Sequence, residues 1–208
     1  MLIELLWQSH LFRPLQKKSE ITRLLEIVSS INAHTICEIG SAGGGTTFLL
    51  TQAAAQDAVI VTIDLEFSRP RQEAIIRFAS NTQRVFCLEG NSHHPQMVRE
   101  VRNCLDQQTL DVLYLDGDHS YEGIKTDFEL YSPLVRPGGI IVFHDIVPDF
   151  KTRYGIETTS YVGGVPQFWN ELKGKAPQVE EIIEDPSQDG YGIGIIFTGG
   201  EPGKLIPQ

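Results

Sequence analysis

Five short apolar segments alternate with helix-patterned segments along this chain, and this alternation limits the fold more than any other feature. The apolar segments are nearly continuous, which is typical of strands that are buried on both faces of a sheet. Strands that alternate with helices favour a parallel sheet covered by helices on both sides. The five segments are 35–39, 58–63, 84–88, 110–115 and 140–143.

The C-terminal part of the chain departs from this pattern. Two apolar segments, 179–183 and 192–197, flank a run of turn-forming residues and predict a hairpin. We therefore predict an α/β domain over residues 33–200, with a mostly parallel seven-stranded sheet and a C-terminal antiparallel hairpin. Residues 1–32 are expected to form an N-terminal helical segment that acts as a lid or oligomer contact, and 201–208 a tail.

The composition limits the classes of partner. The 208 residues carry a formal net charge of −10, which disfavours nucleic acid as a partner because phosphate contacts need a basic surface. We expect no membrane span and no secretory signal, because no segment has the required apolar pattern. The three cysteines form no CxxC pair, so a reducing, cytoplasmic setting is expected. The apolar N-terminal segment makes a homodimer the expected assembly.

The segment 35–46 joins the first apolar strand to a helix through a glycine-rich turn. Such a turn lets a ligand approach the backbone, and the helix N-terminus supplies N–H donors. Glu38 lies two residues before the first glycine, Gly40, where a negative charge disfavours a pyrophosphate and favours an ammonium group. S-adenosylmethionine carries both an ammonium and a sulfonium group, and it is the expected cofactor.

Other ligands fit this turn less well. A phosphate-binding P-loop ends in Gly-Lys-Ser/Thr, yet no lysine occurs between Lys18 and Lys125. The dinucleotide fingerprint needs a second glycine two residues after Gly40, where Ala42 stands. The alternatives are a tight turn in another α/β protein, a nucleotide-dependent oxidoreductase and a non-catalytic cofactor-binding relative.

Polar residues at the carboxyl ends of the strands are candidate ligand contacts, because open α/β sheets bind ligands there. Asp64 ends the second strand and can accept hydrogen bonds from a ribose diol. Asn91 and Ser92 follow the third strand, where small polar side chains can reach an adenine edge.

Acids and imidazoles follow the fourth and fifth strands. Asp116 and Asp145 are expected to lie close together because these strands should be neighbours, and a divalent cation would relieve the repulsion between them. A Lewis-acidic cation lowers the pKa of an acceptor hydroxyl, and a nearby base then takes the proton. His119 is the preferred base and Asp118 the second candidate, although a helix cap explains Asp118 equally well.

These motifs together resemble the class I S-adenosylmethionine-dependent methyltransferases. The resemblance covers residues 36–145 and is strongest to a subgroup with macrolide-sugar O-methyltransferases, cephalosporin hydroxylase-type proteins and catechol O-methyltransferase. It implies a Rossmann-like methyltransferase fold and an O-methyltransferase acting on a hydroxyl of a small molecule, such as a sugar or natural-product scaffold.

The resemblance also implies roles for individual residues. It supports His119 as the base and implies a magnesium site at Asp116, His144 and Asp145. His144 stands where the subgroup has an acid and Ile146 where the catechol pattern has Asn, and an imidazole ligand moves the preference toward metals such as manganese. The implied cofactor contacts are Glu38, Gly40, Ser41, Gly44, Thr46, Asp64, Asn91, Ser92 and Asp116.

Aromatic residues after the fifth strand are candidates for the acceptor site. The loop 147–165 and the residues that follow it contain Tyr154, Tyr161, Phe168 and Trp169. We expect this segment to cap the acceptor, whose identity the sequence does not specify.

Overall fold

The computed structural model describes Phe12 and residues 14–199. The expectations for residues 1–11 and for the tail at 201–208 lie outside the described residues. Within the described part, seven strands form one sheet in the order β3-β2-β1-β4-β5-β7-β6. The strands are β1 (Thr35–Ile39), β2 (Val59–Asp64), β3 (Arg84–Glu89), β4 (Leu110–Leu115), β5 (Val135–His144), β6 (Val179–Ile182) and β7 (Ile193–Phe197).

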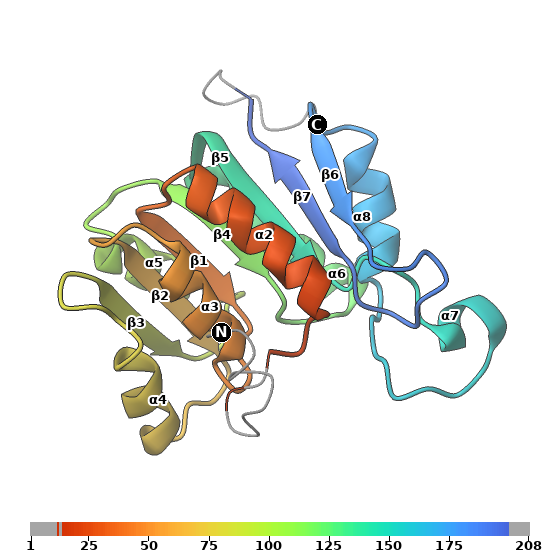
Figure 1. The fold of residues 1–208 in the computed structure, drawn as a ribbon, viewed down its shortest axis with the longest axis horizontal. Helices are drawn as coiled ribbons and strands as arrows, with labels where there is room; N and C mark the ends of the chain where they lie inside the picture. The colour runs from red at the N-terminus through yellow and green to blue at the C-terminus, as the bar shows by residue number, and fades with distance from the viewer. Residues whose placement is uncertain (1–11, 13, 200–208) are drawn as a thin grey trace.

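Helices connect the strands and cover both faces of the sheet (Figure 1). The described helices are α2 (Lys18–Ser30), α3 (Gly45–Ala53), α4 (Arg69–Ile76), α5 (Pro95–Cys104), α6 (Tyr121–Tyr131), the 3-10 turn η1 (Ser132–Leu134), α7 (Phe150–Tyr154) and α8 (Val165–Lys173). The apolar residues of α2, α3 and α4 pack in one core cluster, and those of α5, α6 and α8 pack in another. None of these helices is both long and apolar enough to cross a membrane.

The sheet topology confirms the predicted fold class. Strands β1 to β5 are parallel, whereas β7 is antiparallel to both β5 and β6. The chain runs outward from β1 to β3 and returns to β4, so the direction of winding reverses between β1 and β4. Such a reversal opens a crevice at the carboxyl ends of the two strands, which is where ligands bind in this architecture.

Alternation along β1 sends its side chains to opposite faces of the sheet. Cys37 and Ile39 belong to the core cluster under α5, α6 and α8, and Ile36 belongs to the cluster under α2 and α3. Glu38 shares the face of Ile36 and is fully buried there. The alternation of β1 therefore turns the Glu38 carboxylate toward α3 rather than toward the edge of the sheet.

Two elements differ from the sequence expectation. Strand β5 begins at Val135 rather than at residue 140, so Pro137, Gly138 and Gly139 lie within it. The register shifts between the pairs Leu110–Val135 and Val112–Ile140, so the proline and glycines occupy a bulge. Helix α7 was not predicted, because its five residues are too few to show an apolar period.

Candidate active site

A cavity of about 820 Å³ lies at the carboxyl ends of the parallel strands. Residues from the ends of β1, β2, β4 and β5 contribute to its wall, together with the loop that precedes α8. The wall contains most of the polar residues that the sequence singled out. These are Asp64, Asn91, Ser92, Asp116, Asp118, His119, His144 and Asp145.

The backbone conformation and the neighbouring atoms require glycine at two positions of the first turn, Gly40 and Gly44. Gly40 has a φ of +89°, and a Cβ atom there would lie 2.0 Å from the main-chain oxygen of Asp116. Gly44 has a φ of +84°, and a Cβ atom would lie 2.7 Å from the side chain of Ile75 on α4. Only glycine tolerates both the conformation and the contact. Gly40 lines the cavity, whereas Gly44 packs against α4.

Glu38 does not line the cavity. Its Oε2 atom accepts hydrogen bonds from the hydroxyl groups of Thr47 at 2.5 Å and Thr62 at 2.6 Å. Its Oε1 atom is buried and has no partner among the described residues. Burial raises the pKa of Glu38 to about 7, although the two hydroxyl groups favour its ionised form.

Two other predicted contacts of this loop, Ser41 and Thr46, also have protein partners. The hydroxyl group of Thr46 donates to Gln16 Oε1 at 2.8 Å, and Gln16 Nε2 donates to Asp116 Oδ2 at 3.1 Å. Ser41 Oγ donates to Asp64 Oδ2 at 3.4 Å. Ser41 and Thr46 are absent from the wall of the cavity. Gln16 could not be identified as a site residue from the sequence, because the residues around it form no motif.

The three residues predicted to contact the nucleoside do line the cavity. Asp64 Oδ2 accepts a hydrogen bond from the main-chain N–H of Ala42 at 2.9 Å, which holds the glycine turn against β2. Asn91 Oδ1 accepts the main-chain N–H of His93 at 2.8 Å, and the main-chain oxygen of Ser92 accepts from the hydroxyl group of Tyr131 at 2.9 Å. The end of β3 is therefore a rigid turn.

Two acids and two imidazoles converge at the ends of β4 and β5. His144 Nδ1 lies 3.1 Å from Asp116 Oδ1 and 3.5 Å from Asp145 Oδ2. His119 Nε2 lies 3.3 Å from Asp116 Oδ1, and its Nδ1 lies 3.5 Å from Asp145 Oδ2. The structure thus brings together the four residues that the sequence placed at these strand ends, and we call them the acid–imidazole cluster.

The charges of this cluster are strongly coupled. Burial alone lowers the pKa of an imidazole, but Asp116 and Asp145 raise the pKa of both His119 and His144 to about 9. Burial opposes ionisation of Asp116, but the two imidazoles lower its pKa below the usual value. Burial raises the pKa of Asp145. The cluster therefore favours ionised Asp116 beside protonated imidazoles.

The ring of His119 is held in one orientation. Its Nδ1 atom lies 2.8 Å from the main-chain oxygen of Tyr161, and a carbonyl oxygen can only accept, so Nδ1 carries the hydrogen. The Tyr161 ring stacks on His119 with centroids 5.9 Å apart. This loop approaches closely because Gly163 has no side chain, since a Cβ atom there would lie 2.1 Å from the main-chain oxygen of His119.

Asp145 has a left-handed backbone conformation with a φ of 60°, which is uncommon for a residue with a side chain. Its Oδ1 atom accepts the main-chain N–H of Tyr191 at 3.0 Å. The next residue, Gly192, donates its N–H to Glu20 Oε2 at 3.0 Å, and Glu20 is a fully buried carboxylate on α2. The conformation of Asp145 is therefore tied to the loop between β6 and β7 and, through it, to α2.

The hydrogen bonds of Asp118 are made outside the acid–imidazole cluster. Its Oδ1 atom accepts the main-chain N–H of Ser120 at 2.8 Å, and Ser120 in turn caps α6 through a hydrogen bond from Gly123 N at 3.0 Å. These contacts lower the pKa of Asp118. They are the contacts of a helix-capping turn, although the residue also lines the cavity.

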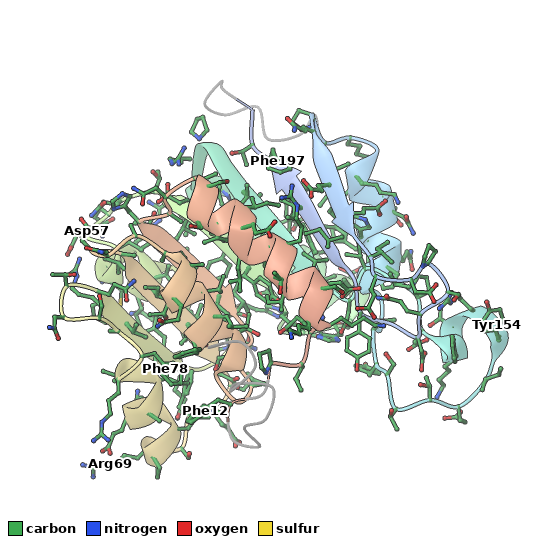
Figure 2. The ribbon with its side chains drawn as sticks, viewed as in Figure 1. Phe12, Asp57, Arg69, Phe78, Tyr154 and Phe197 are labelled. Carbon is green, nitrogen blue, oxygen red and sulfur yellow. The ribbon has the colours of Figure 1, made fainter. Side chains whose placement is uncertain are left out.

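The aromatic residues expected to cap the acceptor divide into two groups. Tyr161 lines the cavity and has an exposed fraction of 71%. Phe168 and Trp169 are buried in the core under α8 and take no part in the wall. Tyr154 is exposed on α7 at the margin of the molecule (Figure 2). The cap over the cavity is thus a short segment around Tyr161.

The fold, the crevice at the winding reversal and the acids at the strand ends define a class I methyltransferase. Residues 37–146 match the sequence pattern of a family described as a methyltransferase domain. The chain belongs to this family, and the resemblance stated from the motifs is confirmed.

Individual proteins show the same relationship at low identity. A protein of Sinorhizobium fredii (strain NBRC 101917 / NGR234), the uncharacterized protein y4gI, is 26% identical over 186 residues, which is 84% of this chain and 18% of the relative. A protein of Mycobacterium sp. (strain JLS) is 27% identical over 130 residues, or 58% of this chain and 53% of that protein. The chain thus spans about half or less of these relatives.

Solved structures share the fold. The O-methyltransferase from Bacillus cereus in complex with SAH has a TM-score of 0.65 at 21% identity, over 94% of this chain and 90% of that one. The MycE methyltransferase in complex with Mg, SAH and mycinamycin VI has a TM-score of 0.58 at 14% identity, over 90% of this chain and 51% of that one. At these identities the comparisons support the fold.

Proposed function

We propose that this chain is an S-adenosylmethionine-dependent O-methyltransferase that methylates a hydroxyl group of a small molecule with the help of a divalent cation. The observation that carries the proposal is the acid–imidazole cluster at the edge of the same cavity that contains Gly40, Asp64 and Asn91. A cofactor site and a proton-accepting site therefore share one cavity at the place where this fold binds ligands.

The donor set of the cluster fits a divalent cation. One ligand atom each from Asp116, His144 and Asp145 lies within 4.8 Å of the others, and all three residues lie at the ends of rigid strands. Two carboxylates and an imidazole suit magnesium less well than manganese, because magnesium prefers oxygen ligands. A bound cation would lower the pKa of the acceptor hydroxyl and orient it.

Several residues of the cavity are suited to the cofactor. Asp64 has a carboxylate for the ribose hydroxyl groups, while Asn91 and Ser92 lie where the adenine would be held. Glu38 acts at a distance in this proposal, since it is buried behind the turn and contributes negative potential for the cationic part of the cofactor. S-adenosylmethionine supplies an electrophilic methyl group on its sulfonium.

His119 is the proposed base. A cation held by Asp116, His144 and Asp145 would balance the carboxylates in place of the second ring proton, and His119 would then be neutral. Because Nδ1 donates to the carbonyl of Tyr161, Nε2 is the atom that can take the proton of the acceptor hydroxyl. Asp116 and Asp145 face the ring and stabilise the imidazolium that forms, which is the direction of its raised pKa. Tyr161 both orients the ring and shields it from water on one face.

The charge of the cavity restricts the acceptor. Among the described residues, the wall contains no lysine or arginine but four aspartates. Phosphate-rich acceptors, such as coenzyme A esters, are disfavoured by such a wall. Leu15, Tyr161 and Tyr191 supply exposed apolar surface at the same cavity, so an uncharged or cationic hydroxyl compound is the proposed acceptor. The homodimer stays a prediction, because its expected contact lies outside the described residues.

The test compares Asp145→Ala with the control Asp57→Ala, whose exposed carboxylate lies at the opposite end of the sheet (Figure 2). Calorimetry with S-adenosylhomocysteine should give similar dissociation constants for both variants and the parent protein. Methyl transfer to a panel of hydroxyl compounds should fall about 10³-fold in Asp145→Ala and after EDTA treatment, because several kcal/mol of catalysis are lost. Turnover that survives both treatments contradicts the cation-assisted mechanism.

A further inference from the structure

Gln16 joins the first turn of α3 to the acid–imidazole cluster. It precedes α2 and is almost fully buried, with an exposed fraction of 5%. Its Oε1 atom accepts a hydrogen bond from the hydroxyl group of Thr46 at 2.8 Å, and its Nε2 atom donates to Asp116 Oδ2 at 3.1 Å. Glutamine side chains usually lie at the protein surface, so burial of this amide beside a carboxylate points to a specific role.

The partners of Gln16 determine which end of its amide faces which residue. An ionised carboxylate can only accept hydrogen bonds, so the NH₂ end of the amide must face Asp116. The carbonyl end then faces Thr46, whose hydroxyl group can donate. Thr46 lies in the first turn of α3 and is itself buried. The amide is therefore held against a rigid element and cannot turn over without placing its oxygen atom against the carboxylate.

The two oxygen atoms of Asp116 have different partners. Oδ1 lies 3.1 Å from His144 Nδ1, and Asp145 Oδ2 lies 3.5 Å from the same nitrogen atom. Oδ1 is therefore the oxygen atom that converges with the other donor atoms of the proposed cation site. Oδ2 accepts the hydrogen bond from Gln16. Because this bond restricts rotation of the carboxylate, Gln16 keeps Oδ1 directed at the cation site.

We propose that Gln16 is a positioning residue for the divalent cation, and that it acts through Asp116 without contacting the cation. A residue that holds a metal ligand in place commonly changes the metal affinity about 10–100-fold when it is replaced. A purely structural role of Gln16 would change the stability of the protein and leave its metal affinity unchanged. The proposal rests on the proposed function, because it concerns the cation of the same site.

The test measures binding of Mn²⁺ to the full chain without cofactor, by electron paramagnetic resonance of the free ion. The parent protein should show a Mn²⁺ site that is lost in Asp145→Ala, because this variant lacks a proposed ligand. Gln16→Met keeps the length of the side chain but removes both hydrogen bonds. It should weaken the affinity of that site about tenfold or more.

The matched control is Gln83→Met. Gln83 also ties α3 to a neighbouring segment, since its Nε2 atom donates to the main-chain oxygens of Thr51 and Ala55, both at 2.9 Å. It contributes neither to the cavity wall nor to the acid–imidazole cluster. Both methionine variants should lower the melting temperature, because each loses the hydrogen bonds of one amide. Only Gln16→Met should lower the Mn²⁺ affinity.

Gln16→Asn is a second variant with a milder change. It keeps the amide but is shorter by one methylene group, so it cannot reach Thr46 and Asp116 together, and its Mn²⁺ affinity should also fall. A thermal melt shows which variants are folded. Parent-like Mn²⁺ affinity in folded Gln16→Met or Gln16→Asn, or an equal loss of affinity in Gln83→Met, overturns the proposal. A parent protein without a Mn²⁺ site that depends on Asp145 instead overturns the cation-assisted part of the proposed function.

Discussion

The glycine turn after β1 and the acid–imidazole cluster after β4 and β5 lie at the same edge of the sheet, yet their polar groups are satisfied differently. In the turn, Asp64 accepts from Ala42 and Ser41, and Thr46 donates to Gln16. In the cluster, acids and imidazoles face mainly one another, and the buried Nε2 atom of His144 has no partner among the described residues.

This difference separates two uses of polar residues. The contacts of the turn hold the backbone in a conformation that glycine permits, so changes there should act first on stability. The cluster gathers four titratable groups at close range, which costs free energy unless ligands or protons balance them. Changes there should act first on chemistry. The following variants test this separation.

The largest expected effect is the loss of turnover in His119→Ala. Removal of a general base lowers rates about 10²–10⁴-fold, and the side chain lies at the surface of a cavity rather than in the core. We expect only a small fall in melting temperature, because the imidazole that balances Asp116 and Asp145 is lost, and a similar affinity for S-adenosylhomocysteine, measured beside initial rates. A loss of less than tenfold would remove His119 from the mechanism, and a large fall in melting temperature would break the separation.

Gly40→Ala should act in the opposite way. The added Cβ atom would lie 2.0 Å from the main-chain oxygen of Asp116 in a backbone with φ of +89°, so the protein should lose about 3–5 kcal/mol of unfolding free energy. The control is Gly174→Ala, because Gly174 has no atom within 4 Å of its Cβ position and an ordinary helical backbone. Urea unfolding compares the two. Equal stability of both variants would show that the turn tolerates a side chain.

The smallest expected effect concerns Glu38→Gln and pH. Burial raises the pKa of Glu38 in the folded protein to about 7 from its usual value of 4.5, so the folded state holds its proton more tightly. The contribution of this group to the unfolding free energy is fully present below pH 4.5 and is lost as the pH rises through 7. The variant lacks this loss, so its stability relative to the parent should rise by at most about 3 kcal/mol over that range. Parallel profiles of unfolding free energy against pH would contradict this assignment.

The sequence predicted the sheet and the cluster well because both depend on short-range patterns. Continuous apolar segments show where the parallel strands lie. The residue that follows each strand lies at the ligand-binding edge of the sheet, however the helices pack. Asp116, His144 and Asp145 therefore came together as expected. Contacts between segments far apart in the sequence could not be predicted in this way, since Gln16, which precedes α2, reaches Thr46 on α3 and Asp116 after β4.

Glu38 shows a second limit of prediction from the sequence. Glu38 lies on β1 in the order of residues that the motif describes, but strand alternation turns its side chain toward Thr47 on α3 instead of toward the cavity. The motif described the order of residues along the chain, whereas the direction of the side chain depended on which face of β1 the helix covers. Its proposed influence on the cofactor is therefore through charge rather than contact.

Glu20 joins the first described helix to the last loop of the sheet. It accepts hydrogen bonds from Gly192 and Gln188, and the residue before Gly192 holds Asp145. A shortened expression clone or a chimera that replaces α2 would remove this carboxylate and free the loop between β6 and β7. The damage would then show at Asp145, which lies more than 100 residues along the chain from the edit.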